Sequence, residues 1–331
     1  MTAGNVKIVG VIGAGAFGTA LACAAARAGR QVRLWGRDAG AMAEMSAARG
    51  MPKLPGLALP ASIQPTADLA EAAGSEALIL AVPTQALREV CLQLAPLAKA
   101  GTPVILAAKG IERASGDFVS DIARETLPAC PPLVLSGPGF AADIAKAYPT
   151  ALTLACADAA LGQRLAKAIG SPAFRLYHST DLRGVEIGGS AKNVLAIAAG
   201  VAAGRGFGES TVAALLARSF AELTRFGLAF GARTETLAGL SGLGDLILTG
   251  TSSRSRNRRF GEELGKGIGI EAAIRDVGLA EGVWTAPILA SMADDKGVDM
   301  PVAAAVADLV AGKASIDQAI DRLLSRPLRA E

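Results

Sequence analysis

Residues 6–18 read VKIVGVIGAGAFG, and this stretch decides the fold of the first half of the chain. Its β-branched beginning predicts a strand, and the alanine-rich run Gly15–Ala28 predicts the helix that follows. Gly13 permits a tight turn, Gly15 lets the backbone approach a pyrophosphate, and Gly18 lets the helix pack close to the strand. Because the first N–H groups and the dipole of a helix favour an anion, the turn predicts a dinucleotide-binding site.

Strand-like runs alternate with helical patterns as far as about residue 180. The predicted strands are Val6–Gly13, Gln31–Gly36, Glu76–Val82, Thr102–Ala107, Pro132–Ser136, Thr150–Cys156 and Phe174–His178. Helical patterns such as Gln85–Ala98 and Asp117–Leu127 separate most of them. Strands that alternate with helices predict a parallel, doubly wound sheet with right-handed crossovers, which is a Rossmann-type α/β domain.

The pattern changes near residue 185, after which helical patterns replace the strand signals. They cover Val185–Ala203, Glu209–Phe226, Gly261–Ile268, Ile270–Val277, Ala286–Ala293, Val302–Ala311 and Ile316–Leu324. At 331 residues the chain is long for one hydrophobic core, so two domains are expected. We predict the Rossmann-type domain over residues 1–184 and an all-α domain over residues 185–331.

Composition excludes several classes of function. Hydrophobic residues make up 51% and charged residues 19% of the chain, which is the composition of a globular protein. The longest apolar run, Val194–Gly204, is shorter than the ~20 residues of a spanning helix, so it predicts a buried core helix and no membrane span. A net charge of +3 gives no reason to expect a nucleic-acid partner.

Cysteine and histidine usage bears on location and on metals. The four cysteines lie far apart without a CxxC spacing, which predicts buried thiols. Since His178 is the single histidine, no His-based zinc site can be assembled, and no metal is expected. We predict a cytoplasmic protein, and apolar surface on the alanine-rich second domain predicts a homodimer.

The end of the second predicted strand bears on the choice of nicotinamide cofactor. An NAD site usually offers an acid there, about 20 residues past the glycines, to bind the ribose 2′-hydroxyl. This chain has Arg37 at that point, with Arg33 nearby, and a guanidinium group binds a 2′-phosphate in bidentate geometry. Asp38 follows and is expected to cap the next helix. The prediction is NADP(H), with NAD(H) as the alternative if Asp38 turns back to the ribose.

Two lysines stand in otherwise apolar segments. Lys109 follows a predicted strand at the carboxyl edge of the sheet, where open α/β folds bind ligands. It either bridges the cofactor and an anionic substrate or is a solvated loop lysine. Lys192 lies in the helical segment GGSAKNV (188–194), where two adjacent glycines predict the close approach of another segment. A lysine on that face needs a function or a partner, unless its long stem reaches past the helix to water.

Further polar residues follow in the second domain. Asp245 lies between apolar runs and is a candidate to pair with Lys192 and orient it. The segment Arg254–Arg259 holds four arginines and suits a phosphate dianion. A nucleic-acid patch is the competing interpretation, but the cluster is isolated and aromatic residues make up only 4% of the chain. His178 ends a predicted strand, so we assign it to completion of the sheet rather than to acid–base catalysis.

With these residues in view, the chain resembles the bacterial NAD(P)-dependent glycerol-3-phosphate dehydrogenase family over nearly its whole length. The matching segments keep the order and spacing of the family: GAGAFGTALA (13–22), LWGRD (34–38), AAKGIE (107–112), SGPGFA (136–141), GGSAKNV (188–194), GLGDLILT (242–249), SRNRRFG (255–261) and AEG (280–282). The resemblance implies an oxidoreductase that transfers a hydride between NADPH and C2 of dihydroxyacetone phosphate, giving sn-glycerol 3-phosphate for phospholipid synthesis.

The resemblance also implies roles for the matching residues. Lys192 is the implied proton donor and acceptor, with Asp245 beside it in the catalytic set. Implied cofactor contacts are Gly13, Gly15, Ala16, Phe17, Gly18, Arg37, Lys109, Ala141, Arg256, Leu279 and Glu281. Implied substrate contacts are Lys109, Gly137, Gly139, Lys192, Asp245, Ser255, Arg256 and Asn257. The family usually carries Ser or Thr where this chain has Gly139, so one hydroxyl contact is missing, and substrate affinity is expected to be lower unless water fills the gap.

Two other functions stay open. A β-hydroxyacid or ketopantoate-type dehydrogenase would share the two-domain plan and a lysine in the helical domain, but it gives no reason for the SRNRR cluster at 255–259. A non-catalytic NADP-binding sensor would leave Lys192, Asp245 and Lys109 unexplained.

Overall fold

The computed structural model describes residues 6–327, which form two compact units. The first unit holds the residues before Gly110 together with Asp117–Val185. The second unit holds Gly110–Gly116 together with the residues from Glu186 onward. The sequence places one boundary at 184/185, whereas the structure also assigns the short segment 110–116 to the second unit.

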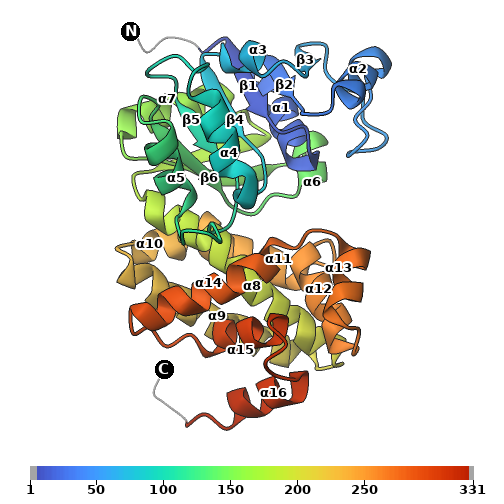
Figure 1. The fold of residues 1–331 in the computed structure, drawn as a ribbon, viewed down its shortest axis with the longest axis vertical. Coiled ribbons are helices and arrows are strands. Elements are labelled where there is room, and N and C mark those ends of the chain that lie inside the picture. Colours follow the sequence, from blue (N-terminus) through green and yellow to red (C-terminus); the bar gives the residue numbers. More distant parts are fainter. Residues whose placement is uncertain (1–5, 328–331) are drawn as a thin grey trace. The chain divides into compact units, whose positions relative to one another are not determined.

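The first unit is built on an eight-stranded sheet with the strand order β3-β2-β1-β4-β5-β6-β7-β8. Figure 1 labels strands β1 to β6 of this sheet. The strands are β1 (Ile8–Ile12), β2 (Gln31–Trp35), β3 (Ile63–Thr66), β4 (Ala77–Leu80), β5 (Val104–Leu106), β6 (Pro132–Ser136), β7 (Thr150–Cys156) and β8 (Phe174–Ser179). The strand order reverses between β1 and β4, and doubly wound sheets bind dinucleotides at the carboxyl ends of such a strand pair. The predicted Rossmann-type fold is confirmed.

Helices cover both faces of this sheet. They are α1 (Ala16–Arg27), α2 (Ala39–Ala48), α3 (Leu69–Ala73), α4 (Thr84–Leu94), α5 (Val119–Thr126), α6 (Ala141–Ala145) and α7 (Ala159–Ile169). Ile79 of β4 belongs to the core on the side of α1 and α7, whereas its neighbours Leu78 and Leu80 belong to the core on the side of α4 and α5. Because both faces are buried, the central strands are nearly continuous apolar runs rather than alternating ones.

Two features of the sheet differ from the sequence-based prediction. The edge strand β3 was not predicted, because its sequence IQPT contains Pro65, and proline weakens a strand pattern. β6 and β7 pair antiparallel rather than parallel. Their connection contains only the five-residue helix α6, which is held against α1 by a hydrogen bond from Arg27 to the Ala145 carbonyl. β7 therefore starts from the edge of the sheet where β6 ends.

The described part of the second unit is helical, as predicted. Its elements are α8 (Leu182–Gly204), α9 (Glu209–Ala229), α10 (Thr234–Leu237), the π-helix η1 (Leu240–Gly244), α11 (Asp245–Thr251), α12 (Arg256–Gly265), α13 (Ile270–Val277), α14 (Glu281–Asp295), α15 (Pro301–Val310) and α16 (Ile316–Leu324). The sequence predicted no helix between 227 and 260, because short helices rich in glycine have low intrinsic propensity. Tertiary packing forms α10, η1, α11 and the start of α12 there.

α8 is the core helix of the second unit. By length and composition alone, it is the one described helix that could cross a bilayer, yet 89% of its most apolar window is buried inside the protein. A helix that is apolar all round and buried is a core helix. This agrees with the interpretation of Val194–Gly204 as a buried core helix.

Glycines bring the backbones of α8 and α12 into contact. A Cβ on Gly200 would lie 2.0 Å from the carbonyl oxygen of Arg258. A Cβ on Gly261 would lie 2.1 Å from the carbonyl oxygen of Ile197. Real atoms do not approach so closely, so only glycine allows these two helices to cross at this separation. α12, which carries predicted substrate contacts, is thereby fixed against the helix that carries Lys192.

Glu222 of α9 caps the N-terminus of α15. Its carboxylate accepts hydrogen bonds from the backbone N–H groups of Val302 at 2.8 Å and Ala303 at 3.2 Å. Only 2% of the residue is exposed. Burial raises the pKa of this carboxyl from 4.5 to about 7, although the two N–H groups and Arg225 act in the opposite direction. Asp299 adds a smaller upward contribution.

The raised pKa of Glu222 predicts that the protein becomes less stable as the pH rises. Between pH 4.5 and about 7 the folded protein keeps a proton on Glu222 that the unfolded chain releases. The stabilising contribution is therefore complete below this window and lost above it, and it amounts to about 3 kcal/mol in the free energy of unfolding. Urea unfolding across the window should show this slope in the wild type and a flatter one in Glu222→Gln. Equal slopes in the two proteins would contradict the assignment.

Candidate active site

The glycine turn at the carboxyl end of β1 has the geometry that the motif requires. Gly13 has a φ of +115°, which favours glycine. A Cβ on Gly18 would lie 1.9 Å from the carbonyl oxygen of Gly13, whereas a Cβ on Gly15 would meet nothing within 4 Å. α1 begins at Ala16, and its N-cap Gly15 provides no side-chain hydrogen bond. The turn therefore combines open space at Gly15 with a helix N-terminus that suits an anion.

The end of β2 presents Arg37, while its charged neighbours are engaged elsewhere. Asp38 is the N-cap of α2 and accepts a hydrogen bond from the Ala41 N–H at 3.0 Å, as the sequence predicts. Arg33 donates to the carbonyl of Glu71 at 2.7 Å. Arg37 itself is exposed. Its guanidinium is therefore an exposed positive charge at the end of β2, where a dinucleotide fold binds the ribose of the cofactor.

Lys109 and Gly137 meet beyond the carboxyl ends of two neighbouring strands. β5 and β6 are parallel and adjacent, so the segments that follow them lie at the same edge of the sheet. Nζ of Lys109 donates to the Gly137 carbonyl at 3.0 Å and lies 5.8 Å from the centre of the Phe17 ring. Three predicted contacts, from three separate segments, are thus brought together. Their roles toward a ligand stay predictions.

An apolar wall closes tightly around Gly139. A Cβ at this position would lie 3.1 Å from Cδ1 of Ile144 and 3.2 Å from Cδ2 of Leu152. It would also lie 3.3 Å from the methyl carbon of Thr150. A serine here would have to displace these side chains. At Gly139, where the chain departs from the family pattern, the neighbouring side chains fill the space that a serine or threonine side chain would need.

In the second unit, Lys192 and Asp245 form a buried ion pair. Nζ of Lys192 donates to Oδ1 of Asp245 at 2.9 Å and to the hydroxyl of Thr249 at 2.7 Å. That hydroxyl donates to the Asp245 carboxylate at 3.2 Å. Lys192 is 6% exposed and Asp245 2%, so the lysine does not reach past the helix to water. The expected contact between the two is present.

Thr249 is a member of this cluster that the sequence reasoning missed. It follows Asp245 by one helical turn in α11 and is buried. Residues four apart share a helix face, so the spacing within GLGDLILT was the signal that could have found it.

A glycine and a π-helix bring Asp245 to the lysine. η1 directly precedes Asp245, and π-helical turns occur frequently at functional sites. A Cβ on Gly188 would lie 2.5 Å from the carbonyl oxygen of Ser241, which is part of η1. The close approach predicted from the paired glycines of α8 is confirmed at Gly188. The segment that approaches Gly188 is η1, which directly precedes Asp245.

Two buried asparagines connect α8, α12 and α14. Nδ2 of Asn257 donates to Oδ1 of Asn193 at 2.9 Å, and Oδ1 of Asn257 accepts from the N–H of Gly282 at 3.0 Å. A Cβ on Gly282 would lie 2.5 Å from the carbonyl oxygen of Asn193, so this junction requires glycine. Asn257, a predicted substrate contact, therefore also orients Asn193. Sequence reasoning gave Asn193 no role, although it directly follows Lys192.

The arginine cluster lies at the N-terminus of α12. Ser255 is the N-cap, and its hydroxyl accepts from the Arg258 N–H at 3.2 Å. Arg258 is paired with Glu262 at 3.0 Å. Arg256 is exposed at the first position of the helix. Arg259 lies 3.6 Å from Asp276. A helix N-terminus with an exposed guanidinium suits a phosphate better than a long polyanion, because two of the neighbouring arginines are already paired with carboxylates.

The other predicted contacts lie at helix starts. Ala141 begins α6, Glu281 begins α14, and Leu279 is 40% exposed just before α14. The contacts of these three residues to the cofactor stay predictions. His178 is exposed on β8, where its ring contacts Gln163 at 3.1 Å.

The chain matches two family models, and the matches cover most of its length. The model described as "NAD-dependent glycerol-3-phosphate dehydrogenase N-terminus" matches residues 8–162, and the corresponding C-terminus model matches residues 181–321. The glycerol-3-phosphate dehydrogenase (NAD(P)+) of Azorhizobium caulinodans is 57% identical over 324 residues, or 98% of each chain. The relative of the same name from Rhodopseudomonas palustris is 54% identical over 328 residues, or 99% of each chain.

Comparison of structures agrees. The 2.1 Å crystal structure of glycerol-3-phosphate dehydrogenase from Coxiella burnetii matches with a TM-score of 0.92 at 35% sequence identity, over 97% of this chain and 99% of that chain. The dinucleotide turn and the buried lysine cluster thus occur in a chain whose relatives are named as NAD(P)-dependent oxidoreductases. This protein belongs to the NAD-dependent glycerol-3-phosphate dehydrogenase family.

Proposed function

We propose that this protein reduces dihydroxyacetone phosphate to sn-glycerol 3-phosphate with NADPH, and that Lys192 donates the proton. The buried cluster of Lys192, Asp245 and Thr249 carries the proposal. Reduction of a carbonyl needs a proton donor held in a fixed place, and this cluster supplies one. The names of relatives that match almost the whole chain support the choice of substrate.

The reaction adds a hydride to the carbonyl carbon C2 and a proton to its oxygen. When bound, the reduced nicotinamide supplies the hydride. Lys192, as an ammonium, stabilises the negative charge that develops on the oxygen and then transfers a proton to it. Asp245 and Thr249 hold Nζ in position, and the Asp245 carboxylate balances the ammonium charge where an unpaired charge would be costly. In the reverse direction the neutral amine of Lys192 accepts the hydroxyl proton.

The first unit has the features that a nicotinamide dinucleotide requires. The space at Gly15 and the uncapped start of α1 fit a pyrophosphate. Arg37 would hold the 2′-phosphate of NADPH, and the engagement of Asp38 as a helix cap supports NADPH over NADH. Lys109 and Arg256 would bind the substrate phosphate, so that binding energy from a remote group holds the ketone in line.

Absorbance of NADPH, followed in parallel with dihydroxyacetone phosphate, glyceraldehyde 3-phosphate and ketopantoate, tests the proposed function. We expect oxidation with dihydroxyacetone phosphate only. Turnover of ketopantoate in its place would favour a ketopantoate-type dehydrogenase. Binding of NADPH without oxidation under any of the three conditions would indicate a non-catalytic sensor.

Removal of the Thr249 hydroxyl is expected to slow turnover without affecting the cofactor. A hydrogen bond to a charged group contributes about 1.5–3 kcal/mol, so Thr249→Val should lower kcat about 10-fold or more. The KM for NADPH should stay unchanged, and Thr249→Ser should restore most of the activity. Steady-state kinetics of the two variants provide the measurement. Wild-type kcat in Thr249→Val would show that the hydroxyl does not help to place Nζ.

We also infer a cytoplasmic homodimer. The four cysteines are free and buried, as is usual in reducing compartments. In the second unit, Leu228 is 51% and Ile247 50% exposed, which supports an apolar contact surface. Sedimentation equilibrium tests the dimer, and a monomer at micromolar concentration would contradict it.

A further inference from the structure

We propose that Arg183 is a positioning residue, which fastens the first turn of α8 to α5 and thereby fixes the placement of Lys192 on the same helix. The inference deepens the proposed function and rests on the role of Lys192 in it. Arg183 touches neither substrate nor cofactor in this proposal. It acts on proton transfer only through the course of α8.

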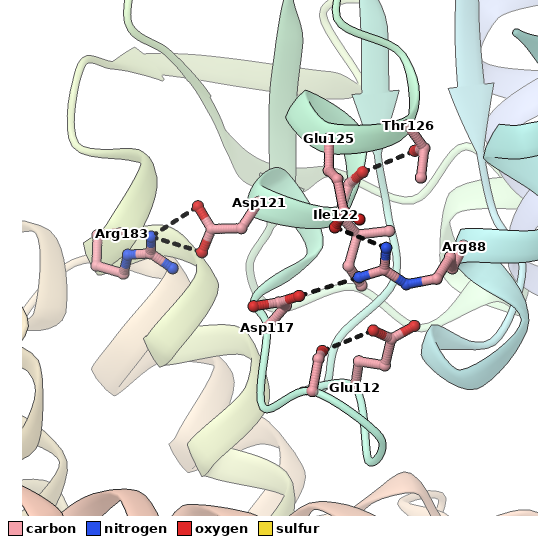
Figure 2. Close-up of polar contacts among 9 residues, drawn as sticks. Arg88, Glu112, Asp117, Asp121, Ile122, Glu125, Thr126 and Arg183 are labelled. Carbon is pink, nitrogen blue, oxygen red and sulfur yellow. Dashed lines mark hydrogen bonds and ion pairs between the residues drawn. The ribbon is translucent and has the colours of Figure 1, made fainter.

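Arg183 contacts Asp121 of α5 and Phe118, the N-cap of that helix; Figure 2 shows the pair with Asp121. Its Nη2 donates to the two carboxylate oxygens of Asp121 at 3.0 and 2.8 Å. Its guanidinium carbon also lies 4.1 Å from the centre of the Phe118 ring, at the N-cap of α5. Phe118 is 3% exposed and the Arg183 side chain 26%, so the contact is partly shielded from water. An arginine that both pairs with a carboxylate and stacks on a ring has little freedom to move.

The anchored turn is part of a helix that continues from one unit into the other. α8 runs from Leu182 to Gly204, and residues 182–185 belong to the first unit, where Val185 is in the core beside α4 and α5. Lys192 lies on the portion that belongs to the second unit. The helix is the only element of the described chain that both units share. The first turn of α8 is therefore packed in the core of the first unit, and Lys192 lies further along the same helix.

Three glycines lower the intrinsic helix propensity of this part of α8. Gly184 lies in the anchored turn, and two further glycines, at 188 and 189, precede Lys192. Each glycine in a helix interior costs about 1 kcal/mol relative to alanine, because its unfolded backbone has more freedom to lose. Side-chain contacts therefore help to keep the turn in place. Asp181 accepts a hydrogen bond from the Gly184 N–H at 2.8 Å within the turn, and Arg183 connects the turn to Asp121 of α5.

Because Lys192 lies far along α8 from Arg183, a small tilt of the first turn moves Lys192 by a larger distance. Lys192 follows Arg183 by nine residues, which is about 13 Å along an α-helix. A tilt of the first turn by about 5° would move Lys192 by about 1 Å at this helical rise. A displacement of that size at a reacting group can cost about 100-fold in rate.

Ion pairs with α4 hold α5 and the segment before it in place, and this limits the movement of Asp121 on α5. Arg88 of α4 pairs with Asp117 at 3.0 Å and with Glu125 at 2.6 Å (Figure 2). Arg124 binds the same carboxylate as Arg183, at 2.9 Å from Oδ1 of Asp121. Arg124 donates hydrogen bonds to Ser120 and Asp121, both on its own helix α5. Arg124→Met is therefore a matched control, which removes one arginine from Asp121 and leaves the contact to α8 in place.

Steady-state kinetics of Arg183→Met, Arg183→Lys and Arg124→Met in the full-length protein test the proposal. Arg183→Met should lower kcat about 10-fold or more, while the Kd for NADPH stays unchanged. Arg124→Met should change kcat by no more than about twofold, as for a single exposed ion pair. Arg183→Lys keeps the charge and should recover part of kcat. With NADPH deuterated at the transferred position, the isotope effect on kcat should increase in Arg183→Met, because misplacement slows the chemical step itself.

Asp121→Asn provides a second route if Arg183→Met does not fold. It should lower kcat to a similar extent, and in the double variant with Arg183→Met the two losses should not add. Wild-type kcat in Arg183→Met or Asp121→Asn would overturn the proposal. Equal losses in Arg124→Met and Arg183→Met would also overturn it, because they would show an effect of charge at Asp121 rather than of α8. A parallel loss of NADPH affinity would do the same, because it would show damage to the dinucleotide-binding unit.

Lys192→Met, measured in the same assay, separates this inference from the proposed function. If Lys192→Met loses turnover and Arg183→Met keeps it, only the positioning role fails. If Lys192→Met keeps wild-type turnover, Lys192 is not the proton donor of the proposed function, and the positioning role of Arg183 fails with it.

Discussion

Lys192→Met is expected to lower kcat by about 10²- to 10⁴-fold, the range typical of removing a general acid or base. Methionine has a similar length but carries no proton to transfer and no charge to stabilise a developing alkoxide. The glycine turn that we predict to bind the dinucleotide belongs to the other unit, so the Kd for NADPH should stay unchanged. Single-turnover measurement of NADPH oxidation, together with fluorescence titration of NADPH, gives both quantities.

The buried partner complicates this variant, and a second one resolves the difficulty. Without Lys192, Asp245 would be an unpaired charge at 2% exposure, and removing one partner of a buried pair costs about 3–5 kcal/mol of stability. The double variant Lys192→Met/Asp245→Asn removes both charges and should unfold at a temperature closer to that of the wild type. Both variants should lack turnover. Turnover close to the wild type in either of them would show that Lys192 is not the proton donor.

Arg37→Ser is expected to shift the cofactor preference toward NADH. If Arg37 pairs with the 2′-phosphate of NADPH, its loss removes charge-assisted hydrogen bonds of about 1.5–3 kcal/mol, and kcat/KM with NADPH should fall about 10- to 100-fold. The value with NADH should hardly change, since NADH has no 2′-phosphate. Parallel assays with the two cofactors provide the measurement.

Arg33→Ser is the matched control for this substitution. Arg33 is also an arginine of the β2 region, but it donates to the Glu71 carbonyl and holds the backbone there. Its loss should lower the unfolding temperature and leave the ratio of the two kcat/KM values unchanged. A wild-type protein that prefers NADH, or an Arg37→Ser variant with an unchanged ratio, would contradict NADP specificity.

Local chemistry accounts for the parts of the fold that could be predicted. The turn at Gly13, Gly15 and Gly18 depends on backbone conformation and on contacts between sequence neighbours, which the residue types specify. The cap formed by Asp38 is local in the same way, because its partner Ala41 is three residues away. The central strands were visible because both their faces are buried and their sequences are apolar throughout.

Features that depend on distant partners escaped prediction. β3 contains a proline and exists because β2 offers it an edge to pair with. The antiparallel β6–β7 pair, the π-helix η1 and the short helices around it are stabilised by packing that no sequence window contains. The assignment of residues 110–116 to the second unit also depends on contacts between residues far apart in the sequence.

The amino-acid sequence by itself determined the family, the dinucleotide-binding turn and the identity of Lys192 and Asp245 as candidates, because residue types and short spacings carry that information. Tertiary structure alone decided that Thr249 joins the pair, that Asn257 orients Asn193, and that Arg183 is held by Asp121 and Phe118. Asn193 and Asn257 are 64 positions apart, and Arg183 and Asp121 are 62 positions apart. Side chains so far apart along the chain meet only after helices pack, and the packing depends on the shape of the whole core rather than on any one stretch of sequence.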